Sequence, residues 1–223
     1  VSTLAKMLNP KIKVIGVEPE GANCMQESLK EGKVVTLPSV NTIADGTAVK
    51  RPGDLLFPYI QINVDDIITI EDSELIVAFL DMVENHKMIV ENSGLLTVAA
   101  LKHLNVKKKK VVSILSGGNM DVITMASIVQ HGLIQRDRVF TVSVLLPDKP
   151  GELAKVANLM AEEQGNVIKL EHNQFVSINR NAAVELRITV EAFGTDHKNK
   201  IVEALKEAGY RPKLVKSKNI YDV

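Results

Sequence analysis

The chain has very little cysteine, no excess of either charge and no long apolar run. Its single cysteine, Cys24 among 223 residues, excludes an internal disulfide framework and is typical of a reducing cytoplasm. The 27 Lys and Arg balance the 27 Asp and Glu, which argues against nucleic acid or an anionic membrane as the main partner. No apolar stretch approaches the roughly 20 residues that span a bilayer, and no secretory segment is recognised at the start. We therefore expect a cytoplasmic protein whose ligands are small molecules.

The sequence also lacks a recognisable metal-ligand set or nucleophile. None of the five histidines has metal-ligand spacing, and each is expected to be an ordinary surface or half-buried side chain. They are His86, His103, His131, His172 and His197. No lysine stands in the desolvated or cation-rich surroundings that make an amine nucleophilic near neutral pH. We therefore expect none of these lysines to act as a catalytic amine.

Up to residue 136, apolar strands alternate with amphipathic helices. Strands are predicted at residues 13–18, 66–70 and 110–115, and helices at 23–31, 72–84 and 95–104. The lysine run at 107–110 is expected to be a solvated turn. This alternation is typical of an open α/β sheet whose ligands bind at the carboxyl ends of the strands.

The pattern changes after residue 136. Strands are predicted at 139–146, 167–173, 183–192 and 211–215, and helices at 153–164 and 197–208. The order βαββαβ is that of the ferredoxin-like split unit. Because such a small sheet leaves its edges and one face open, we expect it to pair with a second copy.

The most informative segment is the apolar run of residues 110–115 together with the turn that follows it. Its Val and Ile content is typical of a buried parallel strand, and it leads into Ser116-Gly-Gly-Asn119 ahead of a helix. Paired glycines let a backbone approach a ligand closely, and the helix offers free amide groups. A hydroxyl aimed from such a turn suits a heterocycle nitrogen or a phosphate. The alternative is a structural turn in which Ser116 caps the helix.

Four motifs occur in the order found in fold-type II pyridoxal-phosphate enzymes. They are Gly16-Val-Glu-Pro-Glu-Gly-Ala22, Ile43-Ala-Asp-Gly46, Val90-Glu-Asn-Ser-Gly94 and Ser116-Gly-Gly-Asn119. Further along, Asp148-Lys-Pro-Gly-Glu-Leu153 is similar to the loop that joins a strand to a helix in ACT domains. Together these features resemble the threonine ammonia-lyase (threonine dehydratase) family in its form with one ACT domain, to which the serine racemases are related.

The resemblance implies a division into two domains. Residues 1–136 would be the C-terminal portion of a pyridoxal-phosphate-dependent catalytic domain, with part of its α/β sheet, and residues 137–223 an ACT regulatory domain. In the family, the Schiff-base lysine, an asparagine against the cofactor ring and a glycine-rich phosphate loop all lie upstream of this region. The first residue is Val1 rather than Met. We therefore expect a fragment of a longer protein that is inactive alone.

The resemblance implies that the residues in contact with pyridoxal 5'-phosphate are Ser116, Gly117, Gly46 and Glu91. The Ser116 hydroxyl would hydrogen-bond the pyridine nitrogen, and an uncharged partner leaves that nitrogen largely unprotonated, which suits elimination of a β-hydroxyl. Gly46 would line the edge of the ring, with Glu91 close by, although Asn92 here follows Glu91 where relatives usually have proline. The alternatives are a simple turn at Gly46 and a helix-capping carboxylate at Glu91.

Two further sites follow from the resemblance. Asn119 would contact a nucleotide effector, as in relatives activated by AMP or ATP, the alternative being a helix start. Glu18, the carbonyl of Ala22 and position 24 correspond to the cation site of the racemases. Because Cys24 stands where the metal-binding relatives have Asp, one anionic oxygen is missing, so we expect a monovalent ion or no ion.

In the second unit, the resemblance implies an effector loop made of Asp148, Gly151, Glu152 and Leu153. Backbone amides at the amino end of the following helix can bind an amino-acid carboxylate. The residues expected to contact the effector's amine across a dimer interface are Asn166, Val167 and Ile168. The alternative is that Pro150-Gly151 only forms the turn.

The implied function of the parent protein is deamination of L-threonine to 2-oxobutanoate and ammonia, with L-serine as a weaker substrate. The ACT unit would bind an amino acid, with a branched-chain amino acid as the hypothesis, in a homodimer or homotetramer. Isoleucine biosynthesis and threonine catabolism both stay open as the pathway. The alternatives are a non-catalytic amino-acid sensor that oligomerises through its ACT sheet and a serine racemase-like enzyme with an attached sensor.

Overall fold

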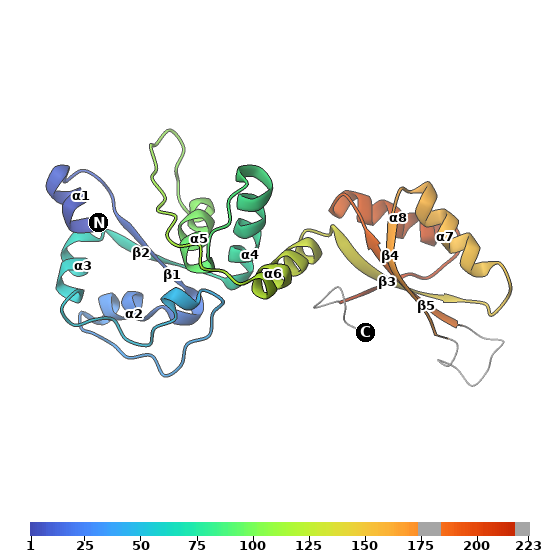
Figure 1. The fold of residues 1–223 in the computed structure, drawn as a ribbon, viewed down its shortest axis with the longest axis horizontal. Helices are drawn as coiled ribbons and strands as arrows, with labels where there is room; N and C mark the ends of the chain where they lie inside the picture. Colours follow the sequence, from blue (N-terminus) through green and yellow to red (C-terminus); the bar gives the residue numbers. More distant parts are fainter. Residues whose placement is uncertain (174–183, 217–223) are drawn as a thin grey trace. The chain divides into compact units, whose positions relative to one another are not determined.

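The computed structural model describes residues 1–173 and 184–216. The chain forms two compact units, Val1–Met125 and Ala126–Val223, and each has its own sheet (Figure 1). The division falls within α6 (Val122–Gln135). None of the helices formed by the described residues has both the length and the apolar character that crossing a bilayer requires.

The sheet of the first unit has two parallel strands, β1 (Ile15–Pro19) and β2 (Asp66–Ile70). The helix α2 (Cys24–Glu31) contacts β2, and α5 (Asn92–Ala99) contacts β1. Figure 1 shows α2 on one side of the two strands and α5, with α4 (Asp72–Asp81), on the other. The two strands predicted at these positions are confirmed to within two residues at each end.

The helices of the first unit begin and end at residues that favour those boundaries. Glu71 and Glu74 form a reciprocal capping box at the start of α4. Gly32, with φ of 67°, ends α2 in the left-handed conformation that glycine adopts readily. The other elements are α1 (Ser2–Leu8), η1 (Glu20–Ala22), η2 (Asp45–Thr47), α3 (Phe57–Asn63), η3 (Met82–His86) and η4 (Ala100–His103).

The strand predicted at residues 110–115 is wrong in this structure. These residues form no strand, and apolar side chains that a buried strand would hide are open, with Val112 89% exposed. A parallel strand needs a neighbour for its backbone hydrogen bonds, and the described residues offer none beside this segment. Two side-chain bonds hold it against α5 instead: the Thr97 hydroxyl donates to the Ile114 carbonyl (3.1 Å), and the Ser113 hydroxyl donates to the Thr97 carbonyl (3.3 Å).

The second unit has an antiparallel sheet with the strand order β4-β5-β3-β6. Its elements are β3 (Val139–Leu146), α7 (Glu152–Glu162), β4 (Asn166–Asn173), β5 (Val184–Glu191), α8 (Thr195–Glu207) and β6 (Lys213–Val215). This sequence of elements and this strand order confirm the predicted ferredoxin-like βαββαβ unit.

The core of the second unit lies between α7, α8 and one face of the sheet. Alternate residues of β3 and β5 point into it, as the two-residue period of a strand requires. Val142 and Val144 on β3, and Leu186 and Val190 on β5, are all 0% exposed. The helices add Val156, Met160, Ile201 and Leu205 to this core. This unit therefore buries a continuous apolar face of its own.

Candidate functional site

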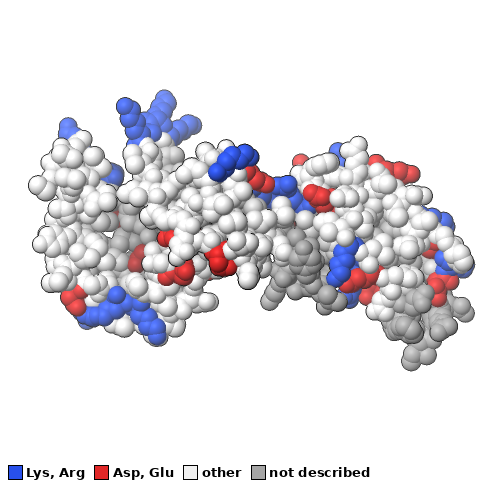
Figure 2. Space-filling model, viewed as in Figure 1, with Lys and Arg blue, Asp and Glu red and all other residues white. Residues whose placement is uncertain are grey.

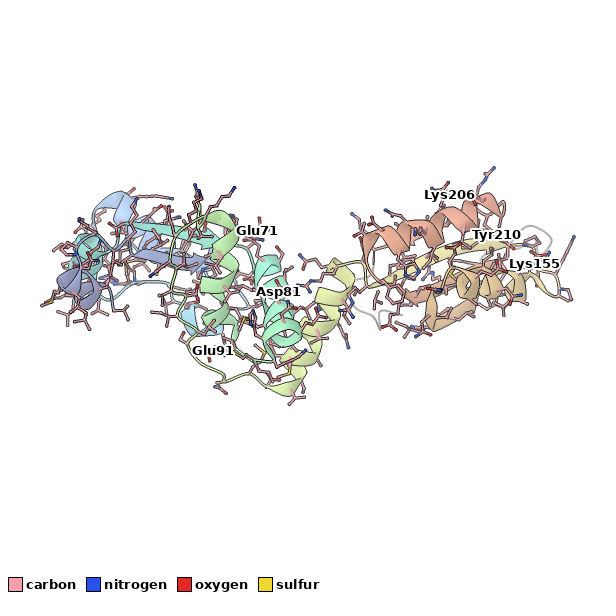
Figure 3. All side chains as sticks on the ribbon, turned by 90° about the horizontal axis from the view of Figure 1, so that it is seen from above. Glu71, Asp81, Glu91, Lys155, Lys206 and Tyr210 are labelled. Carbon is pink, nitrogen blue, oxygen red and sulfur yellow. The ribbon has the colours of Figure 1, made fainter. Side chains whose placement is uncertain are left out.

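The amino end of α5 and the turn after residue 115 lie side by side in the first unit. Glu91 is the residue that precedes α5 (labelled in Figure 3), and its backbone N–H points at the Gly117 carbonyl (3.4 Å). The Glu91 carboxylate in turn accepts a hydrogen bond from the Asn119 N–H (3.3 Å). A Cβ built on Gly94 would lie 2.2 Å from the Ser116 carbonyl oxygen, so only glycine permits this approach.

A third segment, around Gly46, joins this pair. The Asn92 side chain donates to the Ile43 carbonyl (2.9 Å), which ties the start of α5 to the loop that carries Gly46. A Cβ on Gly46 would lie 2.8 Å from the Ser93 hydroxyl and 3.7 Å from a Glu91 carboxylate oxygen. Segments that are far apart in the sequence, 43–46, 91–94 and 116–119, therefore converge at one place.

Two buried polar atoms at this convergence have no hydrogen-bond partner in the described part of the chain, the Ser93 hydroxyl and the Asn92 side-chain oxygen. An unsatisfied buried polar atom costs about 1–3 kcal/mol, and such atoms are rare in folded proteins unless a ligand or water completes them. Both residues belong to the motif at 90–94, but neither was predicted from the sequence to be a site residue. The feature of the sequence that could have identified them is the polar Asn-Ser pair directly before the apolar residues of α5.

The predicted cofactor residues occupy this same place. Gly117 has φ of 81°, and a Cβ on it would lie 2.1 Å from the Glu91 carboxyl carbon, so the glycine gives that carboxylate its space. Ser116 is exposed, and its hydroxyl bonds to no described residue. It does not cap a helix, because α6 begins at Val122 and is held by Asp121, whose carboxylate accepts the N–H groups of Ile123 and Thr124.

The convergence offers polar groups to a ligand, because the Ser116 hydroxyl faces solvent and two buried polar atoms lack partners among the described residues. The glycines serve the close approach of the segments, since the space beside Gly46 and Gly117 is taken by Ser93 and Glu91. Asn119, the predicted nucleotide contact, meets the Glu91 carboxylate through its backbone and leaves its side chain exposed. Within the first unit, the structure brings Gly46, Glu91, Ser116 and Gly117 together.

The predicted cation residues have a different arrangement. The two oxygens of the Glu18 carboxylate accept the backbone N–H groups of Met25 (2.9 Å) and Gln26 (2.8 Å) at the start of α2. Burial raises the pKa of Glu18 above its ordinary value, although these two hydrogen bonds lower it. Ala22 and Cys24 are both 1% exposed. The described residues contain no cluster of three or more His, Cys, Asp or Glu side chains placed to ligate a metal ion.

In the second unit, the predicted effector loop leads into α7. Gly151 stands before the helix with φ of 92°, and a Cβ there would touch nothing within 4 Å. The Glu152 carboxylate accepts a hydrogen bond from Lys155 (2.6 Å), which holds the pKa of Glu152 below its ordinary value. Tyr210 also points its hydroxyl at this carboxylate (3.5 Å), and Figure 3 shows Lys155 and Tyr210 near one another. Lys155 and Tyr210 are two neighbours that the sequence reading missed.

The second group of predicted effector residues lies at the other end of the sheet. In the strand register, Asn166 is opposite Glu191 at the carboxyl end of β5, whereas Leu146, which precedes the loop, is opposite Val184 at its amino end. The eight residues of β5 span about 25 Å at about 3.3 Å each. Val167 and Ile168 next to Asn166 are 36% and 47% exposed. One chain alone therefore does not bring the two groups together.

Two family models match separate parts of the chain. Residues 1–117 match the family described as pyridoxal-phosphate dependent enzyme, and residues 140–209 match the ACT domain. An L-threonine ammonia-lyase of Geobacter sulfurreducens is 34% identical over 97% of this chain and 54% of its own length. A biosynthetic L-threonine dehydratase of Pasteurella multocida is 31% identical over 94% of this chain and 40% of its own length. The chain spans about half the length of the curated relatives it matches, or less.

Two solved structures resemble the chain over somewhat more than half its length. The processed form of threonine deaminase isoform 2 from Solanum lycopersicum is 34% identical, covers 58% of this chain and 39% of its own, and has a TM-score of 0.56. Maize serine racemase is 37% identical, covers 56% of this chain and 41% of its own, and has a TM-score of 0.52.

Proposed function

Because the chain belongs to the pyridoxal-phosphate dependent enzyme family and carries an ACT domain, we propose that it is the C-terminal part of a threonine ammonia-lyase. The parent enzyme converts L-threonine to 2-oxobutanoate and ammonia, with L-serine as a weaker substrate. The observation that carries the proposal is the convergence of segments 43–46, 91–94 and 116–119 on two unsatisfied buried polar atoms. The substrate is proposed from the relatives, an L-threonine ammonia-lyase and a biosynthetic L-threonine dehydratase.

Four residues of this chain would hold pyridoxal phosphate: Gly46, Glu91, Ser116 and Gly117. When bound, the cofactor supplies an electron sink for the α-carbon of an amino acid. The Ser116 hydroxyl would donate to the pyridine nitrogen without bringing a charge, which would leave that nitrogen largely unprotonated. An unprotonated ring withdraws electrons from the α-carbon less strongly than a protonated ring. This is sufficient for a substrate that loses its β-hydroxyl, because the leaving group takes the electron pair with it.

The two glycines and two polar residues of the Val90–Gly94 motif would shape the site. Gly46 and Gly117 let Ser93 and Glu91 pack closely against the backbone, since a side chain at either glycine would collide with them. The buried Ser93 hydroxyl and Asn92 amide oxygen are positioned to complete their hydrogen bonds with a bound molecule. The Schiff-base lysine is not assigned within this chain, so the proposal places the covalent chemistry on the rest of the parent protein.

The test is to measure 2-oxobutanoate formed from L-threonine by the full-length product of the gene that encodes this chain, loaded with pyridoxal phosphate. We expect 2-oxobutanoate and ammonia in equal amounts, and none from the 223-residue chain alone. A cofactor-loaded full-length protein that forms no 2-oxoacid from threonine or serine, and yet binds amino acids, would support the non-catalytic sensor instead.

A serine racemase-like enzyme is the second candidate. It is favoured by the likeness to maize serine racemase, at 37% identity and a TM-score of 0.52. The same full-length protein distinguishes the two candidates when it is incubated with L-serine. Chiral analysis that finds D-serine in excess of pyruvate would favour the racemase, whereas pyruvate without D-serine would favour the ammonia-lyase.

For the second unit we propose binding of a branched-chain amino acid that biases the enzyme between two states. The amides at the start of α7, beside Asp148, Gly151, Glu152 and Leu153, would take the carboxylate. A second copy would supply the group at 166–168, because the two groups lie at opposite ends of the sheet in one chain. The active form is therefore at least a homodimer. Calorimetry on the full-length protein that detects no heat with Ile, Val or Leu would contradict this proposal.

A further inference from the structure

Asp137 lies between the end of α6 and the start of β3, and the first turn of α8 holds its side chain. The Thr195 hydroxyl donates a hydrogen bond to one oxygen of the Asp137 carboxylate (2.8 Å), and Lys198 forms an ion pair with the other (2.7 Å). Partial burial opposes ionisation of this carboxyl group, but the two contacts hold its pKa below the ordinary value. A charged Asp137 carboxylate therefore fastens the start of α8 to the end of α6.

The backbone at Asp137 has an unusual conformation that ends α6 at this point. Its φ of 54° lies in the left-handed region, which residues other than glycine adopt at a cost. The N–H groups of residues 136–138 reach back to carbonyls near the end of α6, at 2.8 to 3.0 Å. The contacts of the carboxylate with Thr195 and Lys198 offset the cost of this conformation.

The same turn of α8 also holds the end of α7, through His197. The Phe193 N–H points at Nδ1 of His197 (3.0 Å), and because a backbone N–H can only donate, Nδ1 carries no proton. The ring proton is therefore on Nε2, which donates it to the Glu163 carbonyl directly after α7 (2.6 Å). A cavity of about 620 Å³ borders this junction, and Phe193 in its lining is 81% exposed. Polar contacts rather than a closed apolar core therefore hold the junction together.

These contacts connect the two ends of the second unit. α7 begins at Glu152, in the proposed effector loop, and ends beside the carbonyl that His197 holds. α6 begins at Val122, shortly after the turn 116–119, and the residue after its end is Arg136, next to the fastened Asp137. Helices are stiff elements, so a displacement of α7 at the loop also displaces its other end. The first turn of α8 joins that end to Asp137.

We propose that the first turn of α8 is the joint through which amino-acid binding at the effector loop displaces the end of α6, with Asp137 and His197 as positioning residues. This inference rests on the proposed function, because it names the route by which the proposed effector acts. An amino-acid carboxylate bound at the amino end of α7 shifts that helix. His197 transmits the shift to α8, and Thr195 and Lys198 transmit it to Asp137.

The first measurement uses the 223-residue chain without cofactor or amino acid. Amide hydrogen exchange is followed at residues 136–138, whose N–H groups bond to α6. His197→Ala removes the bond to the Glu163 carbonyl and loosens the first turn of α8, so exchange at 136–138 should become at least about tenfold faster. His197→Gln keeps a side-chain N–H that can reach this carbonyl, and it should restore most of the protection.

The control variant changes another charged residue of the same helix. Charged side chains of both signs are scattered over the visible face of the second unit (Figure 2), and a further pair on α8 joins Lys206 to Glu203 (2.9 Å). Lys206→Met should leave exchange at 136–138 unchanged, since this pair lies towards the end of α8, away from the joint. All variants should keep the far-ultraviolet circular dichroism of the unmodified chain.

The second measurement uses the full-length protein loaded with pyridoxal phosphate. Binding of L-isoleucine is measured by calorimetry, and its effect on kcat for threonine by formation of 2-oxobutanoate. Isoleucine should change kcat of the unmodified protein by about 5- to 150-fold. In Asp137→Gly, glycine accepts the φ of 54° without the carboxylate. This variant should still bind isoleucine, but the factor should fall by about 2- to 30-fold, as for other residues along such routes.

Two further variants support this measurement. Lys206→Met should respond to isoleucine as the unmodified protein does. If Asp137→Gly does not fold, Asp137→Asn takes its place. It can still accept the Thr195 hydrogen bond but loses the ion pair with Lys198, so it should show a smaller reduction in the same direction.

Four results would overturn the proposal. The first is unchanged exchange at residues 136–138 in His197→Ala, and the second is an equal acceleration in Lys206→Met. The third is an Asp137-substituted enzyme that responds to isoleucine as strongly as the Lys206→Met enzyme. The fourth is an active unmodified enzyme whose kcat isoleucine does not change. The exchange measurement needs neither pyridoxal phosphate nor threonine, so its failure is distinct from a failure of the proposed function.

Discussion

The two units of this chain differ in how completely each buries its own apolar side chains. The second unit closes a four-stranded sheet under two helices, and its core side chains are nearly all fully buried. The first unit has a two-stranded sheet, and most of the strongly exposed large apolar side chains of the described residues belong to it, among them Leu4, Met7, Val112 and Ile114. The site of proposed chemistry lies in the first unit. Under the proposed function, a self-sufficient fold would carry regulation, and catalysis would depend on a unit that satisfies its own surface less completely.

The largest effect that would break this comparison concerns the core of the second unit. Leu186 of β5 is 0% exposed, so Leu186→Ala should lower the free energy of unfolding by about 2–5 kcal/mol. Urea unfolding monitored by circular dichroism measures this loss. The matched control is Leu55→Ala in the first unit, which should change the free energy of unfolding by less than about 0.5 kcal/mol because Leu55 is 87% exposed. Equal losses would remove the contrast between the units.

The next effect sharpens the comparison on the catalytic side. Ser116→Ala in the full-length protein should lower kcat for threonine by about 5- to 150-fold, because a hydrogen bond worth about 1–3 kcal/mol to the cofactor nitrogen is lost. Steady-state assays of 2-oxobutanoate provide the measurement. Ser113→Ala is the control, since that hydroxyl donates to the Thr97 carbonyl and lies outside the proposed site. A Ser116→Ala enzyme as active as the Ser113→Ala enzyme would show that Ser116 is a turn residue.

The smallest effect is a pH dependence of opposite sign in the two units. Burial raises the pKa of Glu18 in the first unit above 4.5, and the Ser143 hydrogen bond lowers the pKa of Glu185 in the second unit below 4.5. The raised group stabilises the fold below its unfolded pKa and loses this effect as pH rises through the folded pKa. The lowered group stabilises it above its unfolded pKa and loses this effect as pH falls through the folded pKa.

Two isosteric variants measure these signs. The stability difference between the unmodified chain and Glu18→Gln should decrease as pH rises from about 4 towards 7. The difference for Glu185→Gln should decrease as pH falls from about 5 towards 3. Urea unfolding across this range provides both curves. If the two stability differences changed with pH in the same direction, the pKa values of Glu18 and Glu185 would not be shifted in opposite directions.

The sequence predicted local structure well, but it predicted poorly which strands pair with partners that are distant in the sequence. Strong local signals, such as Gly32 after α2 and the acidic start of α4, placed helix ends correctly. The alternation of β3 and β5 predicted the ferredoxin-like unit because the partner strands lie within the same 87 residues, 137–223. The strand at 110–115 failed because a parallel strand depends on neighbours, and composition alone does not supply them.

The candidate site was predictable only in part. Ser116, Gly117, Gly46 and Glu91 carry motif signals, and the structure brings them together. Their spacing in the sequence gave no indication that a Cβ on Gly117 would strike the Glu91 carboxylate. The unsatisfied atoms of Asn92 and Ser93 became visible only when burial and hydrogen-bond partners could be examined. The separation of the effector loop from residues 166–168 likewise depends on the strand register.

The central claim is that this chain forms one wall of a pyridoxal-phosphate site at the Gly117 turn. The most direct measurement is an absorbance titration of the full-length protein with pyridoxal phosphate. Gly117→Ala should raise the dissociation constant at least about tenfold, because φ of 81° and a Cβ 2.1 Å from the Glu91 carboxyl carbon displace the turn. Gly118→Ala should bind normally, since its Cβ meets only the Ile89 carbonyl at 3.8 Å. Equal affinity in the two variants would contradict the account.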